Sequence, residues 1–137
     1  MKEFGCPSSA IITPHPGEAA MLLDCSVEEL QKNRLEAAKE LYKRYNCLII
    51  LKGYQTIVFD GEAYQCTDGG PALSTAGTGD VLAGLIGSFL AQGLSKIDAA
   101  RFSVAIHGAA GDKFSKNKGG RGLTATKLIK IINEEML

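Results

Sequence analysis

The pattern of apolar and polar residues at the start of the chain predicts a short strand followed by helices. An apolar run at residues 10–12 stops at two prolines, which bar a helix there and predict a strand end and a rigid loop. Residues 18–23 predict a short helix with Pro16 near its first turn. Ser26 and Glu29 have the spacing of a capping box that opens a longer helix. The apolar face of that helix recurs near the helical period, at Val27, Leu30, Ala37, Ala38, Leu41 and Tyr45.

Strand patterns follow this helix. Residues 47–51 are continuously apolar, which is typical of a parallel strand buried on both faces. Residues 56–59 and 63–66 flank Asp60 and Gly61, and an Asp-Gly pair between two such runs is a strong hairpin signal. A helix that feeds a parallel strand, followed by a hairpin, indicates the α/β class.

The second half of the chain combines glycine-rich segments with helical patterns. A glycine-rich loop covers residues 68–79. Three helices are predicted after it, at residues 80–92 (closed by Gly93), 95–116 and 124–135, with a polar, glycine-rich connection at 116–122. Small residues predict close packing of the first two helices against neighbours: Gly84, Gly87 and Ser88 on one, and Ala99, Ala100, Ser103, Gly108 and Gly111 on the other.

Composition narrows the class of protein. The chain of 137 residues is one domain at most, and 45% hydrophobic with 22% charged residues is ordinary for a globular protein. Fifteen basic and fifteen acidic residues cancel, so the charge pattern of a nucleic-acid or membrane-surface binder is missing. No apolar run approaches the ~20 residues of a membrane span, and the first ten residues lack the apolar segment of a secretory leader.

The cysteines bear on the cellular compartment. Cys6, Cys25, Cys47 and Cys66 are separated by gaps that fit no zinc or redox motif. We expect reduced thiols in a cytoplasmic protein, with a disulfide pair as the alternative.

The junction between the glycine-rich loop and the first predicted helix carries the main candidate chemistry. Gly77, Thr78 and Gly79 leave backbone N–H groups free at a helix start, where the helix dipole also favours an anion. This predicts an anion hole for a phosphoryl group. The segment is not a Walker P-loop, because no Gly-Lys-Ser/Thr follows at the required spacing.

Asp80 stands next to this predicted anion hole. It could be a general base that takes a proton from a substrate hydroxyl as that oxygen attacks phosphorus. The alternative is an acid placed in the first helical turn for the dipole alone. The preceding Gly-Thr-Gly favours the catalytic role, because a simple cap does not need such a loop.

Two further segments follow predicted strands, where ligands bind in open α/β sheets. Lys52 could contact a phosphate and Thr56 a nucleotide, or this segment could be a surface turn. His15, on the rigid proline loop, could donate or accept a hydrogen bond to substrate or could simply be exposed. His107 is predicted to be a packed histidine. Asp60, Glu62 and Asp68 are interpreted as turn residues. The lysines of residues 113–118 are interpreted as a solvated helix end.

These segments occur in a characteristic order: TPHPGE at 13–18, LKG at 51–53, GGPALSTAGTGDVLAG at 69–84, AQG at 91–93, HGAAGD at 107–112 and LTA at 123–125. In this order and spacing, over nearly the whole chain, they resemble the ADP-dependent NAD(P)H-hydrate dehydratases, a branch of the ribokinase-like superfamily. The His-Pro-Gly-Glu loop and the long glycine loop are specific in combination, whereas Gly-Thr-Gly-Asp alone marks only the wider superfamily. Ala76 stands where the family often has glycine, and alanine is also a small residue.

The resemblance implies a ribokinase-like three-layer fold and an enzyme that repairs nicotinamide nucleotides. ADP, or ATP, would phosphorylate the hydroxyl of hydrated NADH or NADPH, and loss of phosphate would restore the double bond. Asp80 would be the catalytic base and would bind the substrate together with His15. Residues matched to nucleotide contacts are Lys52, Gly53, Tyr54, Gln55, Thr56 and Gly79. Mg²⁺ would accompany the nucleotide phosphates without a protein cage of its own, so no residue is predicted as a metal ligand.

The family's domain is much longer than this chain. Residues 1–137 are therefore expected to form one partial ribokinase-like domain, its C-terminal half, with a short parallel sheet, a β-hairpin and C-terminal helices. The surface left uncovered would pair with the missing N-terminal half or with a second copy. One alternative function, a kinase acting on a sugar, hydroxymethylpyrimidine or hydroxyethylthiazole, would share Asp80 and the anion hole. The other, suggested by the missing half, is an inactive truncated module that binds nucleotide or assembles with a partner chain.

Overall fold

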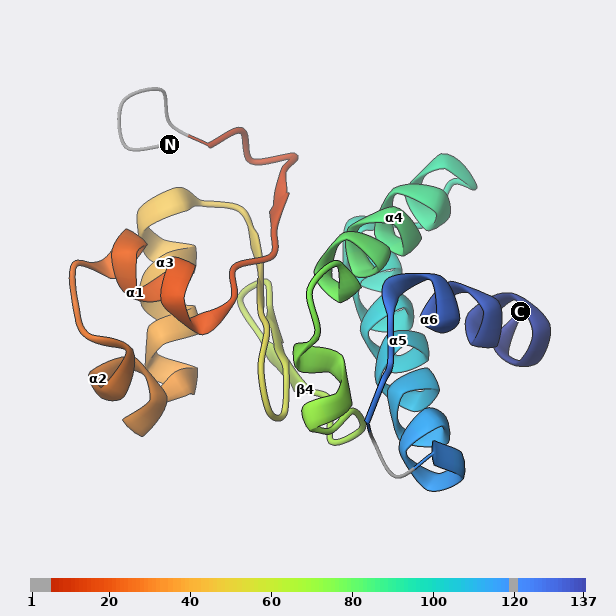
Figure 1. The fold of residues 1–137 in the computed structure, drawn as a ribbon. Coiled ribbons are helices and arrows are strands. Elements are labelled where there is room, and N and C mark those ends of the chain that lie inside the picture. Colours follow the sequence, from red (N-terminus) through yellow and green to blue (C-terminus); the bar gives the residue numbers. More distant parts are fainter. Residues whose placement is uncertain (1–5, 119–120) are drawn as a thin grey trace. The chain divides into compact units, whose positions relative to one another are not determined.

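A computed structural model describes residues 6–118 and 121–137, and the chain divides into two compact units, Met1–Gln65 and Cys66–Leu137 (Figure 1). The elements of the first unit are β1 (Ile11–Ile12), α1 (Pro16–Leu23), α2 (Val27–Lys32), α3 (Arg34–Tyr45), β2 (Leu48–Leu51), β3 (Ile57–Phe59) and β4 (Ala63–Gln65). The second unit contains η1 (Pro71–Ser74), α4 (Thr78–Ala91), α5 (Lys96–Lys118), α6 (Ala125–Ile131) and a π-helical turn, η2 (Ile132–Met136).

The four strands form one mixed sheet in the order β1-β2-β3-β4. β1 is parallel to β2, whereas β2–β3 and β3–β4 are antiparallel. Every residue of β2 is fully buried, which confirms the prediction from its unbroken apolar run. The predicted hairpin is also confirmed: Phe59 pairs with Ala63 across a three-residue turn in which Gly61 has a φ of 90°.

The core of the first unit lies where α3 packs against β2 and β3, with α1 and α2 packed against α3. Alternate strand residues share a face, so Ile49 and Leu51 of β2 lie on the same side as Ile57 and Phe59 of β3. The helices contribute Ala19, Ala20, Leu30, Ala37, Ala38, Leu41 and Tyr45 to the same cluster. The predicted helical period therefore identified most of the buried helix face.

The predicted single helix from Ser26 to Tyr45 is wrong, because the chain breaks at Asn33. Asn33 ends α2 with a non-helical backbone (φ −146°, ψ 75°), and its side-chain oxygen accepts from the N–H of Glu36 to begin α3. The capping box at Ser26 is present as predicted. Val27 is 45% exposed and does not belong to the buried face.

The second unit packs its helices around a separate cluster. α4 begins at Thr78, two residues before the predicted start, and the predicted glycine-rich loop contains the short helix η1. The final predicted helix ends at Ile131 and continues as η2. The core consists of Ala72, Ala110, Phe114, Leu123, Leu128 and Ile132. The polar connection predicted at 116–122 lies partly outside the described residues.

Close packing at glycine is confirmed on α5 and wrong on α4. A Cβ at Gly108 would lie 2.8 Å from the carbonyl oxygen of Asp68, and one at Gly111 would lie 2.7 Å from the Leu73 side chain. Gly84 and Gly87 are exposed, and among the described residues no heavy atom outside their own helix surroundings lies within 4 Å of an added Cβ. Gly108 and Gly111 therefore admit the segment before α4, while α5 also packs against α4 itself.

None of the helices in the described part of the chain combines the length and apolarity needed to cross a bilayer. The four cysteines are free thiols.

Candidate active site

His15 caps α1, and this explains the local sequence around it. Its Nδ1 accepts from the N–H of Glu18 at 3.2 Å, while Oε2 of Glu18 accepts from the N–H of His15 at 2.8 Å. Pro16 occupies the first helical position, where a missing N–H costs nothing. A Cβ at Gly17 would lie 2.9 Å from Cε1 of His15, so glycine leaves room for the ring. The His-Pro-Gly-Glu sequence is thus a reciprocal helix cap.

The second ring nitrogen of His15, Nε2, lies beside the Glu18 carboxylate and is partly open to solvent. Because Nδ1 accepts a hydrogen bond, the hydrogen of the neutral imidazole lies on Nε2. Nε2 is 3.5 Å from Oε1 of Glu18, and the side chain is 56% exposed. The ring is already oriented by the helix, and a ligand that accepts the Nε2 hydrogen would compete with Glu18 for it.

The loop before His15 is joined to the end of β2. The N–H of Lys52 donates to the carbonyl of Pro14 at 2.9 Å, which places the exits of the parallel strands β1 and β2 side by side. Two segments predicted to bind ligand are therefore neighbours at one edge of the sheet.

A tight turn follows Lys52. Gly53 has a φ of +136°, a conformation that side chains rarely adopt, and Gln55 is left-handed with a φ of 56°. The hydroxyl of Thr56 donates to the carbonyl of Gly53 at 3.1 Å, and Nε2 of Gln65 donates to Oε1 of Gln55 at 3.0 Å. Tyr54 at the tip of the turn is 73% exposed. The turn is thus held internally and presents an exposed aromatic ring.

The predicted anion hole lies in the second unit, at the start of α4. Gly77 is the N-cap, with a φ of 86°. Thr78 is buried and internally engaged: its N–H donates to the carbonyl of Thr75 at 3.3 Å, and its hydroxyl lies 2.5 Å from the carbonyl of Leu73 and 2.8 Å from that of Thr75. The N–H groups of Gly77, Gly79 and Asp80 have no hydrogen-bond acceptor among the described residues.

Asp80 lies in the first turn of α4 with an exposed side chain. Within the described part of the chain its carboxylate has no hydrogen-bond or ion-pair partner. A helix N-terminus with free N–H groups and a free carboxylate can bind an anion and accept a proton at the same place.

His107 is a site residue whose structural role the sequence did not reveal. It is buried, as predicted for a packed histidine, and its Nε2 lies 2.8 Å from the carbonyl oxygen of Thr78. It therefore holds the first residue of α4 from the neighbouring helix α5. The small residues around it indicated burial but not this bond.

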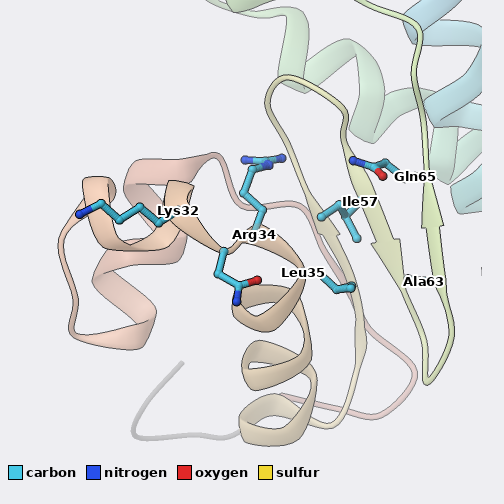
Figure 2. Close-up of a pocket in the computed structure, with 7 residues that line it drawn as sticks. Lys32, Arg34, Leu35, Ile57, Ala63 and Gln65 are labelled. Atoms are coloured by element: carbon cyan, nitrogen blue, oxygen red, sulfur yellow. The ribbon is translucent and has the colours of Figure 1, made fainter.

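A pocket of about 380 Å³ in the first unit contains none of the predicted site residues (Figure 2). Its lining consists of Lys32, Asn33, Arg34, Leu35, Ile57, Ala63 and Gln65. Burial lowers the pKa of Arg34 below its ordinary value. No cluster of three or more His, Cys, Asp or Glu side chains among the described residues could hold a metal ion.

The fold class follows from comparison with solved structures. A ribokinase-like superfamily protein from Enterococcus faecalis matches 98% of this chain with a TM-score of 0.84 and 30% identity, over 47% of its own chain. The predicted ribokinase-like α/β class is thereby confirmed.

The family model of NAD(P)H-hydrate dehydratase matches residues 3–134, and the chain belongs to this family. It is 46% identical over 132 residues to the Escherichia coli bifunctional NAD(P)H-hydrate repair enzyme Nnr, covering 92% of this chain and 26% of that protein. It also matches the ADP/ATP-dependent NAD(P)H-hydrate dehydratase of Bacillus subtilis, co-crystallized with ATP and Mg²⁺, at 36% identity and a TM-score of 0.85, covering 90% of this chain and 45% of that one. The chain thus spans about a quarter of one relative and less than half of the other.

Proposed function

We propose that this chain supplies the phosphoryl-transfer part of an ADP-dependent NAD(P)H-hydrate dehydratase. One observation carries the proposal: the exposed carboxylate of Asp80 stands at a helix start where the N–H groups of Gly77, Gly79 and Asp80 are free within the described residues. Membership of the family supports the choice of substrate class.

In the proposed reaction, the carboxylate of Asp80 takes the proton of the hydrate hydroxyl as that oxygen attacks the terminal phosphorus of ADP, and AMP leaves. The free amides of Gly77 and Gly79 stabilise the negative oxygens of the phosphoryl group during transfer. The phosphate then leaves with the C–O bonding electrons, the neighbouring ring carbon loses a proton to water, and the C–H bonding electrons re-form the double bond. Phosphorylation thus turns a poor leaving group into a good one.

Two segments, besides Gly79, are proposed to contact the nucleotides. His15 would donate its Nε2 hydrogen to the hydrated nicotinamide nucleotide, and residues 52–56 would contact ADP. Mg²⁺ would be carried by the nucleotide phosphates, which would supply its oxygen ligands, with ATP as an alternative phosphoryl donor. Pairing with an N-terminal half or a second copy, and the cytoplasmic location, stay predictions.

The test is restoration of NADH from hydrated NADH by the purified chain with ADP and Mg²⁺, followed by nicotinamide absorbance, alongside calorimetric titration with ADP. Asp80→Asn should bind ADP as the parent does and should lose turnover by a factor of about 10² or more. Asp98→Asn is the matched control, because Asp98 is also a first-turn acid but serves the cap at Ser95. Equal turnover in the parent and Asp80→Asn would overturn the assignment of the base.

The products distinguish the alternative functions. Released inorganic phosphate with restored NADH supports the dehydratase, whereas a stable phosphorylated product identifies a kinase. ADP binding without turnover in both the parent and Asp80→Asn identifies a nucleotide-binding module.

A further inference from the structure

Arg34 links the start of α3 to the end of β2. Its Nη2 donates to the carbonyl oxygens of Leu51 and Lys52, each at 3.2 Å, and its Nη1 donates to Oε1 of Gln31 at 2.8 Å. Figure 2 shows the side chain extending from the helix toward the strands. The guanidinium thus forms hydrogen bonds to the backbone at the point where the chain leaves β2 for the turn at residues 53–56.

This arrangement is unfavourable for the arginine itself. Nε is buried and has no hydrogen-bond partner among the described residues. A cation in the first turn of a helix also opposes the helix dipole. These costs mean that the side chain is not placed there by the local preferences of α3, and its bonds to Gln31 and to the two carbonyls are its evident structural role.

The turn is shaped to fit this guanidinium. A Cβ at Gly53 would lie 2.9 Å from Nη1 and 3.2 Å from Nη2 of Arg34, and Gly53 also needs its φ of +136°. The glycine therefore removes the side chain that would collide with the arginine. The bond from Thr56 to the Gly53 carbonyl then closes the turn above it.

We propose that Arg34 is a positioning residue for the nucleotide-binding turn at residues 52–56. It holds the turn in its ligand-ready conformation before ADP binds, so binding does not have to order the segment. The planar guanidinium is required, because a lysine ammonium is a point charge that does not reproduce the geometry of the arginine donors. The proposal rests on the function proposed above for this turn.

The experiment compares the parent with Arg34→Met, Arg34→Lys and the control Lys32→Met. Lys32 lines the same pocket, but its side chain is 73% exposed and extends away from the strands (Figure 2). Its Nζ lies 3.5 Å from Oε1 of Glu28. Amide hydrogen exchange at Lys52, whose N–H donates to the carbonyl of Pro14, should be faster by about tenfold or more in both Arg34 variants and unchanged in Lys32→Met. Exchange of the β2 amides is followed as the check on folding.

Calorimetric titration with ADP gives the functional readout. Affinity should fall by about tenfold in both Arg34 variants, with Lys32→Met like the parent. Gly53→Ala provides a second route: exchange at Lys52 should be perturbed less by this change when Arg34 is already Met, because part of the collision is then removed.

Unchanged exchange at Lys52 in Arg34→Met overturns the positioning role, as does full rescue by Arg34→Lys. If the parent chain binds no ADP, the nucleotide function of the turn fails. The positioning role of Arg34 is then tested by hydrogen exchange alone. Failure of the nucleotide function and failure of the positioning role are therefore distinguishable.

Discussion

Nε2 of His107 lies 2.8 Å from the carbonyl oxygen of Thr78, across 29 residues of sequence. The acceptor is the first residue of α4, directly beside Gly79 and Asp80. Because a carbonyl oxygen accepts, Nε2 carries the hydrogen. The proposed phosphoryl site is therefore anchored by a buried side chain of the adjacent helix.

Replacing His107 by alanine should destabilise the chain by about 2–4 kcal/mol, since it removes this bond and leaves a cavity. His107→Gln keeps a donor and should cost less. The measurement is the free energy of unfolding in urea. His15→Asn is the control, because an exposed asparagine can still cap α1. A loss below about 0.5 kcal/mol in His107→Ala would show that the anchor is unimportant.

Replacing glycine by alanine should lower the stability of the chain on α5 and raise it on α4. In Gly108→Ala the Cβ would lie 2.8 Å from the backbone carbonyl of Asp68, which cannot move aside cheaply, so about 1–3 kcal/mol of stability should be lost. Gly87→Ala adds its Cβ to an open helix surface and should gain about 0.5–1 kcal/mol. Thermal unfolding midpoints of the two variants test this. Destabilisation by Gly87→Ala would mean that this face is covered in solution.

The cap and the proposed substrate contact of His15 can be separated. Asparagine supplies a side-chain oxygen to the N–H of Glu18 but has no group in place of Nε2. His15→Asn should therefore keep the unfolding midpoint while weakening binding of hydrated NADH by about tenfold. ADP affinity is measured on the same samples and should not change. Unaltered binding of hydrated NADH would leave His15 with the cap alone.

The reactivity of Cys66 should be low. Burial raises the pKa of its thiol, so at a given pH less of the reactive thiolate is present than for an ordinary cysteine. Cys25 is only partly buried. Iodoacetamide followed by peptide mass spectrometry should label Cys25 well before Cys66, and Cys66 labelling should rise only at more alkaline pH. Equal labelling rates of Cys25 and Cys66 would show that the buried surroundings of Cys66 open readily to solvent.

Local signals in the sequence correctly placed the strands, the hairpin at Gly61 and the capping box at Ser26. Each depends on residues within a few positions of one another, through caps, turns and side-chain periodicity. The break at Asn33 also had a local signal, an asparagine suited to a helix start, but the continuing apolar period outweighed it.

The candidate site also has features that the sequence determined and features that only the tertiary structure decided. The sequence alone determined the family, the ribokinase-like class and the candidate residues His15, Lys52 and Asp80. Only the tertiary structure decided that Arg34 reaches the carbonyl of Leu51, 17 residues away, and that His107 reaches Thr78. Such bonds need two elements packed at a fixed distance, and spacing along the chain does not encode that distance.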